Sequence, residues 1–394
     1  MQHEPNMSLP AADAASAAHS ARVADHIRQQ IADAGGQISF AEYMHHALYA
    51  PGLGYYSAGA TKFGEAGDFV TAPEVSPVFA GVLARQCAEI FASLEGPSLL
   101  EVGAGSGRLA CDLLKKFGEL DVVPERYEIL EVSADLRERQ FALLENEVPD
   151  LIGRVSWLDQ FPESLSGVIV ANEVIDALPV ERFAIRADGI SQLCVTSEDD
   201  AFEIAERVAP EPLVMAIEGI EQDLGEALPE GYVSDVRLAS PAWIADMGRS
   251  LESGVAFLFD YGVGRREYYA NDRSGGWLRC HFRHHAHNNA LILPGVQDLT
   301  AWVDFSAVAA AAVDNGLEVA GYVTQAQFLI GGGLDDELAG FGELPIDAQL
   351  KLSGQVKLLT LPGEMGENFK CIGLSHGSVP QPTAFRLADR TMSL

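Results

Sequence analysis

The sequence predicts an α/β fold with a mostly parallel sheet and helices on both of its faces. The chain has 394 residues, of which 48% are hydrophobic, enough to bury a large core. Short apolar runs alternate with helical patterns, and a glycine-rich turn joins the run at 98–103 to the helix after it. Ser39 and Ser133 are the expected N-caps of two helices. Strands are expected at 98–103, 127–133, 154–158, 167–172, 255–262, 317–323 and 369–374, and helices at 77–94, 108–117 and 134–147.

Interruptions of this alternation predict the domain organisation. Residues 1–19, rich in Ala, Ser and Pro, are expected to be disordered. Val23, Ile27 and Ile31 recur on one helix face, so order is expected from about residue 20. The expected parts are N-terminal helices with a lid loop (20–75), a core (76–180, 249–323 and 368–377), insertions (181–248 and 324–367) and a flexible tail (378–394).

The charge of the chain excludes several classes of partner. Its 57 acidic and 26 basic residues give a formal net charge of −31, which repels phosphate backbones and anionic lipid surfaces. No nucleic acid partner is expected, and no apolar run reaches the roughly 20 residues that cross a bilayer. Five cysteines without a C-x-x-C spacing indicate a reducing compartment, and the N-terminus lacks the pattern of a targeting segment. A bacterial cytoplasmic protein is expected, with its oligomeric state left open.

The glycine-rich turn, EVGAGSGR, predicts the ligand. Gly103, Gly105 and Gly107 give G-x-G-x-G, and Arg108 stands where the third glycine of the dinucleotide fingerprint belongs, which disfavours NAD. Backbone N–H groups of such a turn approach a ligand at a helix N-terminus. Glu101, just before the turn, can receive an ammonium group and would repel a pyrophosphate. A zwitterion without phosphate fits both features, so S-adenosylmethionine is the predicted cofactor.

Polar residues at two further strand ends extend this prediction. Glu131 ends the second strand 24 residues beyond Gly107, near where doubly wound folds place an acid on the ribose hydroxyls. Asp159 and Gln160 follow the third strand, where they can hydrogen-bond an adenine amino group. A solvated strand-end glutamate and an ordinary turn aspartate are the alternatives.

With these residues in place, the chain resembles the MidA family, which includes mitochondrial complex I assembly factor 7. The resemblance covers roughly residues 20–376. Its marks are GDFVTAPEVSPVF (Gly67–Phe79), EVGAGSG (Glu101–Gly107), LEVS (Leu130–Ser133), ANEVIDALPVERF (Ala171–Phe183), DYG (Asp260–Gly262), DLTAWVDF (Asp298–Phe305) and FKCIGL (Phe369–Leu374). It implies a seven-strand class I methyltransferase sheet with inserted elements. For the mitochondrial members it also implies arginine methylation of a subunit of respiratory complex I, so a protein substrate is the expected partner.

The acceptor side is expected after the fourth strand. A guanidinium is best held by carboxylates in a bidentate arrangement, which can leave one nitrogen nucleophilic. Asn172, Glu173 and Asp176 supply polar groups there, with the two acids at i and i+3 of an expected helix. Glu173 is the first candidate, and Asn172 is expected to contact the cofactor as well. Tyr261, at the end of a later strand, can pack on the methyl group or the acceptor. In the alternative, Asp176 caps a helix, and Glu173 and Tyr261 are structural.

Two other segments also carry predictions. The loop with Gly67, Asp68, Phe69 and Thr71 can fold over the cofactor as a lid, or serve only as a tether. The run at 265–289 is rich in Arg and His, but no metal is expected there because no second ligand pair with finger-like separation follows. This run can meet an acidic patch on a partner or on the protein's own surface, or form a solvated loop.

Together these residues predict an S-adenosylmethionine-dependent methyltransferase, most strongly one that methylates arginine on a protein. A methyltransferase for a small molecule and a binding protein that kept the fold without catalysis are the alternatives. Acids at the predicted crevice argue against the binding protein. The sequence does not separate the two enzymes.

Overall fold

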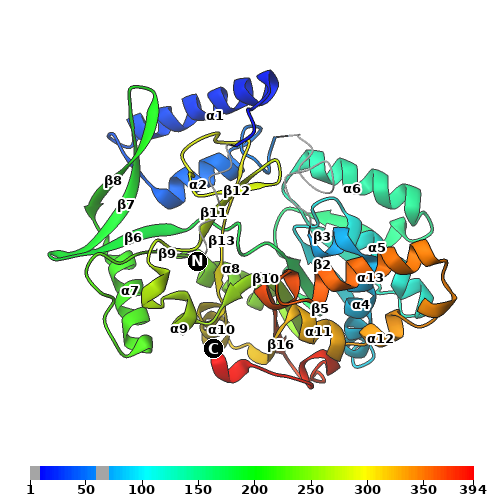
Figure 1. Ribbon diagram of the computed structural model, residues 1–394. Helices are drawn as coiled ribbons and strands as arrows, with labels where there is room; N and C mark the ends of the chain where they lie inside the picture. Colours follow the sequence, from blue (N-terminus) through cyan, green and yellow to red (C-terminus); the bar gives the residue numbers. More distant parts are fainter. Residues whose placement is uncertain (1–8, 59–70) are drawn as a thin grey trace. The chain divides into compact units, whose positions relative to one another are not determined.

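A computed structural model describes residues 9–58 and 71–394, and the chain divides into two compact units. The core unit contains residues 71–176, 239–268 and 302–394. The insertion unit contains residues 177–238 and 269–301 together with the N-terminal segment. Figure 1 labels the elements along the chain. Each unit is therefore assembled from three separate stretches of sequence.

The core unit is built on a mostly parallel sheet with the strand order β15-β16-β10-β5-β2-β3-β4, and β14 pairs with β10. In the described part of the chain, β16 alone runs antiparallel to its neighbours in this order. The strands are β2 (Ser98–Val102), β3 (Arg126–Leu130), β4 (Val155–Leu158), β5 (Leu165–Asn172), β10 (Leu251–Val263), β14 (Val303–Asp304), β15 (Glu318–Thr324) and β16 (Phe369–His376). Each expected strand is present to within a few residues, which confirms the predicted α/β fold.

The register of this sheet sets the edge where the candidate site forms. Val102 at the end of β2 pairs with Leu130 of β3 and with Ala171 of β5. Ala171 in turn pairs with Leu258 of β10. Because the four strands are parallel, the loops that follow them leave the sheet at one edge, where α/β proteins bind ligands.

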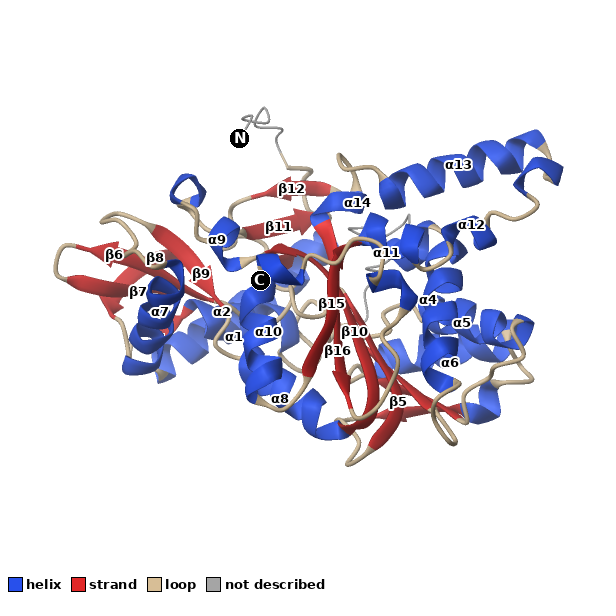
Figure 2. Cartoon of the chain, turned by 90° about the horizontal axis from the view of Figure 1, so that it is seen from below, coloured by secondary structure: helices blue, strands red, loops and turns tan. Residues whose placement is uncertain are grey.

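Helices cover both faces of the sheet, and Figure 2 shows α8 and α10 on one side and α4, α5 and α6 on the other. Phe257 and Phe259 of β10 pack with Phe79 of α4 and Phe328 of α11, with ring centroids 4.9–5.8 Å apart. These rings belong to the hydrophobic core on that face. The helices of the unit are α3 (Ala72–Val75), α4 (Pro77–Phe91), α5 (Arg108–Glu119), α6 (Ala134–Glu147), α8 (Ser240–Ser250), α9 (Arg265–Tyr268), α10 (Phe305–Asp314), α11 (Gln325–Gly331), α12 (Leu334–Glu337), α13 (Ile346–Thr360) and α14 (Met365–Asn368).

The insertion unit combines antiparallel sheets with helices. One sheet has the order β1-β7-β6-β9 with β8 beside β7, and another has the order β12-β11-β13. Helix α2 begins at the predicted N-cap Ser39, which forms a capping box with Glu42. The elements are α1 (Ala14–Asp33), β1 (Ile38–Ser39), α2 (Phe40–Tyr49), β6 (Glu181–Arg186), β7 (Gly189–Glu198), β8 (Ala201–Val208), α7 (Glu211–Leu224), β9 (Val233–Val236), β11 (Leu278–Phe282), β12 (His285–His287) and β13 (Asp298–Ala301). Residues 239–248, expected in the insertion, belong to the core unit because α8 packs against α10.

The N-terminal helix starts earlier than the sequence suggests. Helix α1 begins at Ala14, because the Asp13 carboxylate accepts a hydrogen bond from the Ser16 N–H at 2.9 Å and caps the helix. The disorder expected over 1–19 is therefore wrong for residues 14–19.

The C-terminal segment packs on the core, so the flexible tail expected at 378–394 is also wrong. Phe385 is fully buried against Gly321 and Gly373, where an added Cβ would come within 2.3 and 2.5 Å of it. The Arg390 N–H donates to the Tyr322 carbonyl at 2.7 Å, which fixes the segment along β15. Contacts so distant in sequence leave no local pattern in the tail itself.

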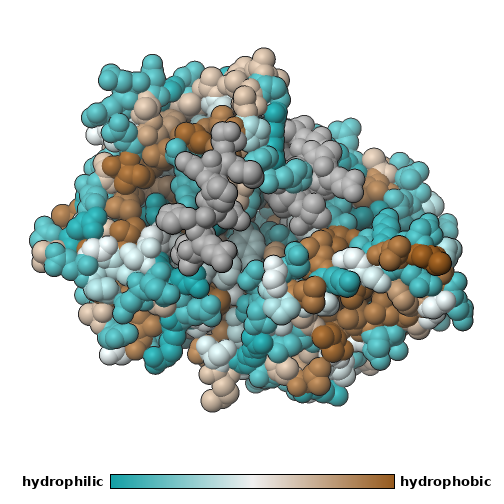
Figure 3. Space-filling view, viewed as in Figure 1, coloured by the Kyte–Doolittle hydropathy of each residue, from teal (hydrophilic) through white to brown (hydrophobic). Residues whose placement is uncertain are grey.

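Helix α13 keeps apolar side chains on the surface. Ile346 and Leu350 are 76% and 70% exposed, and Figure 3 shows hydrophobic atoms over this helix. Leu359, near its other end, is buried in the core. Of the helices in the described ranges, none combines the length and the apolar character needed to span a membrane.

Candidate active site

The glycine turn between β2 and α5 adopts a backbone that favours glycine. Gly103, Gly105 and Gly107 have φ values of +68°, +53° and +83°. A Cβ at Gly103 would lie 3.1 Å from Val174, and one at Gly107 would lie 3.2 Å from Gln140. Gly107 is the N-cap of α5, a helix whose first N–H groups need partners from outside the helix. The turn therefore has the features of a ligand cradle.

Glu101, near the end of β2, is a buried carboxylate with 3% exposure. The Tyr127 hydroxyl of β3 donates to it at 2.5 Å. Burial raises the pKa of Glu101 to about 7; the Tyr127 hydrogen bond opposes this rise and the charge of Glu131 adds to it. A cation beside this carboxyl would favour its charged form, so the position suits an ammonium group.

Glu131 follows β3, and both of its carboxylate oxygens are hydrogen-bonded. The Ser133 N–H donates to one oxygen at 2.9 Å, and the Gln140 side-chain amide donates to the other at 3.3 Å. Gln140 is fully buried on α6, donates to the Gly105 carbonyl at 2.9 Å and accepts from the Trp157 indole at 2.8 Å. One side chain thus joins the glycine turn, the candidate ribose acid and β4.

Asp159 and Gln160 follow β4 and are both exposed. The Asp159 side chain, 87% exposed, forms an ion pair with Arg137 of α6 at 2.6 Å. The same guanidinium donates to the backbone carbonyls of Glu131 and Leu158. Arg137 therefore holds Asp159 beside the end of β3, at the edge that carries Glu131.

The acids after β5 lie on a turn, so the helix expected to place them at i and i+3 is wrong. Glu173 has a φ of +53°, outside the right-handed helical region, and its N–H donates to the Phe259 carbonyl at 2.9 Å. Asp260 of β10 accepts hydrogen bonds from the N–H groups of Ile175 and Asp176, each at 3.0 Å. These bonds to β10 replace the hydrogen bonds that a helix would form.

The four residues predicted for the acceptor side form two hydrogen-bonded pairs around this turn. The Tyr261 hydroxyl donates to the carboxylate of Asp176, which is 3% exposed. The Asn172 amide donates to the Glu173 carboxylate at 3.1 Å. The Phe369 ring packs edge-on against Tyr261, with centroids 5.4 Å apart. The structure thus brings together residues from β5, its following turn and β10.

Sequence reasoning assigned no role to two residues that organise this edge. Asp260 is completely buried, and its second oxygen accepts from the Tyr261 N–H at 2.9 Å. An acid at the carboxyl end of a predicted buried strand was the available signal for it. Gln140 has no such signal, because its partners lie on three other segments of the chain.

The predicted lid is only partly described. Gly67, Asp68 and Phe69 lie outside the described residues. Thr71 is the N-cap of α3, where its carbonyl accepts from the Glu74 N–H at 2.9 Å. The Glu74 carboxylate in turn accepts from the Ser106 hydroxyl, so α3 is bonded to the glycine turn.

Part of the run at 265–289 forms the hairpin β11–β12. Arg283 and His284 occupy its turn with φ values of +49° and +62°. Arg283 forms an ion pair with Asp13, and Arg279 donates to Asn288 at 2.8 Å. Within residues 9–58 and 71–394, no group of three or more His, Cys, Asp or Glu could hold a metal ion. Arg283 thus contacts an acid near the N-terminus, whereas the partner of Arg279 lies within the run itself.

The chain is similar to known proteins over most of its length. Residues 82–323 match the model of a family of S-adenosyl-L-methionine-dependent methyltransferases. The protein arginine methyltransferase NDUFAF7, mitochondrial, of Mus musculus is 32% identical over 371 residues, covering 86% of this chain and 81% of that protein. Its counterpart in Danio rerio is 30% identical over 370 residues, covering 86% and 83%. A crystal structure of a COG1565 superfamily member from Burkholderia thailandensis, bound to S-adenosyl-homocysteine, has a TM-score of 0.92 and 41% identity and covers 98% of this chain and 100% of that chain.

These comparisons confirm two expectations and overturn one. The class I methyltransferase fold and S-adenosyl-L-methionine as the cofactor are confirmed by the family match and by the similar structure with bound S-adenosyl-homocysteine. The cytoplasmic localisation is wrong, because the relatives from Mus musculus and Danio rerio are named as mitochondrial proteins.

Proposed function

The chain belongs to the MidA family of S-adenosyl-L-methionine-dependent methyltransferases, and we propose that it methylates an arginine side chain of a protein. The turn after β5 supports this most directly, because it holds the Glu173 carboxylate beside Asn172 on a left-handed backbone. Strained backbone of this kind collects at functional sites. The curated relatives are named protein arginine methyltransferases, which supports the same acceptor. A subunit of respiratory complex I is the substrate that the family resemblance implies.

The residues at the strand edge fit the cofactor. The hydrogen bonds to Glu101 and Glu131 from the described residues come from neutral donors, which leaves both carboxylates suited to an ammonium and to hydroxyl groups. We assign Glu101 to the ammonium group and Glu131 to the ribose. The turn at Gly103, Gly105 and Gly107 supplies backbone N–H groups. We also assign to the cofactor Asp159, Gln160 and the lid residues Gly67, Asp68, Phe69 and Thr71. The bound cofactor supplies a methyl group on a positively charged sulfur.

The acceptor residues position a guanidinium and localise its charge. Methyl transfer needs little acid or base help when the acceptor is held in line, so positioning dominates the rate. We assign Glu173 to one edge of the guanidinium, which draws positive charge to that side and leaves another nitrogen nucleophilic. We assign Asp176, whose carboxylate accepts from the Tyr261 hydroxyl, to the same guanidinium. One proton leaves the acceptor for each methyl group gained, and these two carboxylates are the nearby groups that can receive it.

Methyl transfer in a cell extract tests this proposal. Purified protein and cofactor with a radiolabelled methyl group are added to extract from a strain that lacks the gene. A labelled protein band, with methylarginine after hydrolysis, is the expected result. Label in small metabolites would favour a small-molecule methyltransferase, and no label would favour a binding protein without catalysis. The Glu173→Gln variant, treated identically, controls for methylation by enzymes of the extract.

A further inference from the structure

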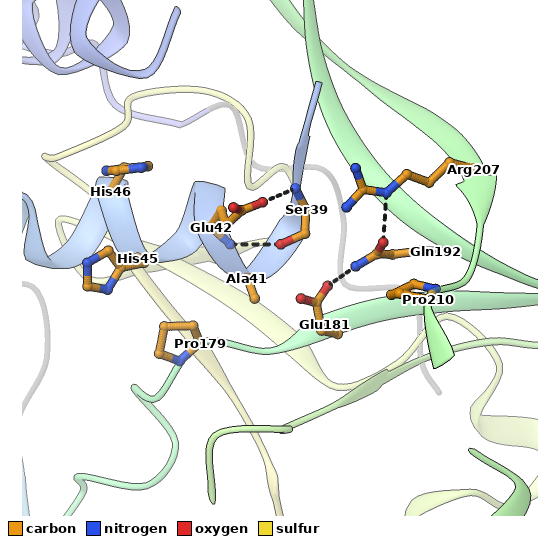
Figure 4. A pocket seen from close by; sticks show the side chains of 10 residues that line it. All are labelled: Ser39, Ala41, Glu42, His45, His46, Pro179, Glu181, Gln192, Arg207 and Pro210. Carbon is orange, nitrogen blue, oxygen red and sulfur yellow. Dashed lines mark hydrogen bonds between the residues drawn. The ribbon is translucent and has the colours of Figure 1, made fainter. Parts of the chain in front are cut away.

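A pocket of about 510 Å³ opens in the insertion unit, and its lining residues are not among those assigned above. Helix α2 and strands β1, β6, β7 and β8 supply its walls, with Pro179 and Pro210 from the connections (Figure 4). Its polar side chains are Ser39, Glu42, His45, His46, Glu181, Gln192 and Arg207. Groups from β1, α2, β6, β7 and β8 thus line one opening.

The Glu181 carboxylate is held in this pocket by neutral groups. Gln192, which is 2% exposed, donates its amide to Glu181 at 2.8 Å and accepts from the Arg207 guanidinium at 2.8 Å. Figure 4 shows this chain of contacts, with the amide between the acid and the base. Among the described residues no ion pair within 4 Å is formed by Glu181, and the Gln192 amide bonds both Glu181 and Arg207. The carboxylate is thus fixed in position by an amide and not by a direct ion pair.

A second carboxylate, that of Glu42 on α2, also lines the pocket. Glu42 accepts from the Ser39 N–H at 2.7 Å in the capping box of α2. Burial raises the pKa of Glu181 and the charge of Glu42 adds to the rise, whereas hydrogen bonds from Gln192 and Ser39 and the charge of Arg207 oppose it. Burial and the neighbouring His26 and His45 lower the pKa of His46, so this imidazole does not supply a counter-charge at neutral pH. A cation in the pocket would relieve the repulsion between the two acids.

We propose that this pocket binds the guanidinium group of an arginine side chain presented by a protein partner. A guanidinium carries five N–H donors in one plane and can donate to two carboxylates at once. An ammonium carries its donors on a single nitrogen atom, so it is less suited to two separate carboxylates. The net charge of −31 favours a basic partner over the whole chain. This binding requires neither the cofactor nor the turn after β5, so it stands apart from the proposed methyl transfer.

Titration of the full chain with Nα-acetyl-arginine methylamide tests the proposal. Calorimetry measures the affinity, and amide spectra of isotope-labelled protein locate the bound probe. Shifts are expected in resonances of α2, β6 and β7, in the Glu173→Gln variant as in the parent. The citrulline analogue has nearly the same shape without the charge, and it should not bind. Glu181→Gln keeps the acceptor for Gln192 and should weaken binding at least fivefold. Arg207→Gln removes the competing cation and should strengthen binding.

Glu42→Gln provides a second test that preserves folding, since Gln also serves at this position of a capping box. It too should weaken binding, with an unchanged melting temperature as the check on folding. Equal affinity of the parent, Glu181→Gln and Glu42→Gln would overturn the proposal, and so would equal binding of the citrulline analogue. Shifts confined to the turn after β5 and abolished by Glu173→Gln would also overturn it, because the probe would then bind only as an acceptor.

Discussion

The buried amide of Gln140 donates to the Gly105 carbonyl at 2.9 Å, so a residue in the middle of α6 fixes the glycine turn from behind. The same amide reaches the Glu131 carboxylate, and its oxygen accepts from Trp157. Gln140 thus supports both the glycine turn and Glu131, which are assigned to the cofactor. Their spacing depends on a side chain that we assign no contact with the cofactor.

Gln140→Leu should therefore weaken cofactor binding and lower stability together. The substitution leaves the Gly105 carbonyl and the Trp157 N–H without their partner, at a cost of about 1–3 kcal/mol for each buried group. Urea denaturation should show a loss of that order, and calorimetry should show about tenfold weaker binding of S-adenosylhomocysteine. Trp157→Phe removes only the hydrogen bond from Trp157 to Gln140 and should retain most of the affinity for S-adenosylhomocysteine. Parent-like affinity of Gln140→Leu would mean that the turn holds its shape unaided.

Glu131→Ala tests the ribose assignment. Loss of hydrogen bonds to a charged acceptor should weaken binding of S-adenosylmethionine by about 1.5–3 kcal/mol. Asp159→Asn is the comparison, because Asp159 is exposed and its loss should matter much less. Calorimetry on both variants measures the difference, and NADH should fail to bind the parent. The ribose assignment is wrong if Glu131→Ala binds as tightly as the parent.

The raised pKa of Glu101 predicts a pH dependence of cofactor binding. An ammonium group binds the charged carboxylate, and a group with a pKa of about 7 goes from about one-tenth ionised at pH 6 to about nine-tenths ionised at pH 8. The affinity for S-adenosylhomocysteine should therefore rise about tenfold over this range. Glu101→Gln should bind more weakly and lose most of this dependence. A parent whose affinity is flat from pH 6 to pH 8 would contradict the assignment.

The contribution of Glu101 to the free energy of unfolding should instead fall as the pH rises through 7. The folded protein binds the Glu101 proton more tightly than the unfolded chain does, because the pKa rises from 4.5 to about 7 on folding. The contribution of Glu101 to stability is therefore full below pH 4.5 and is lost as the pH rises through 7. Glu101→Gln should flatten this part of the stability profile in urea titrations without ligand.

Local chemistry made much of this fold predictable. Ser39 caps α2 and Ser133 caps α6 where the sequence places them, because each side chain bonds an N–H three residues away. The strand pattern is visible because both faces of a parallel sheet are covered and its strands read as apolar runs. The glycine turn is recognisable in the sequence because its backbone conformation restricts the residues that can occupy it.

Long-range contacts account for what the sequence did not reveal. The spacing of Glu173 and Asp176 suits a helix, but Asp260 binds the backbone of this turn from 84 residues farther along the chain. Phe385 likewise fills a place beside Gly321 and Gly373, which a local reading of the tail cannot detect. Both features depend on neighbours that only the sheet order brings together.

The last prediction separates acceptor binding from cofactor binding. Glu173→Gln keeps the shape and an acceptor for the Asn172 amide but removes the negative charge that would localise the guanidinium cation. The rate of transfer should fall about 100- to 1000-fold, the usual cost of losing an electrostatic contact with the reacting group. Cofactor affinity should stay nearly unchanged, because the residues assigned to the cofactor lie on other loops.

Single-turnover methyl transfer to the identified protein substrate, beside calorimetry with S-adenosylhomocysteine, measures both quantities on one preparation. Tyr261→Phe is the matched variant, since it removes the hydroxyl that fixes Asp176 and leaves Glu173 intact. It should slow transfer less than Glu173→Gln does, because the charge at the acceptor remains. An arginine acceptor should respond to the loss of charge more strongly than a neutral acceptor. Parent-like transfer by Glu173→Gln would therefore reject the carboxylate mechanism, and the arginine assignment would then rest on the named relatives alone.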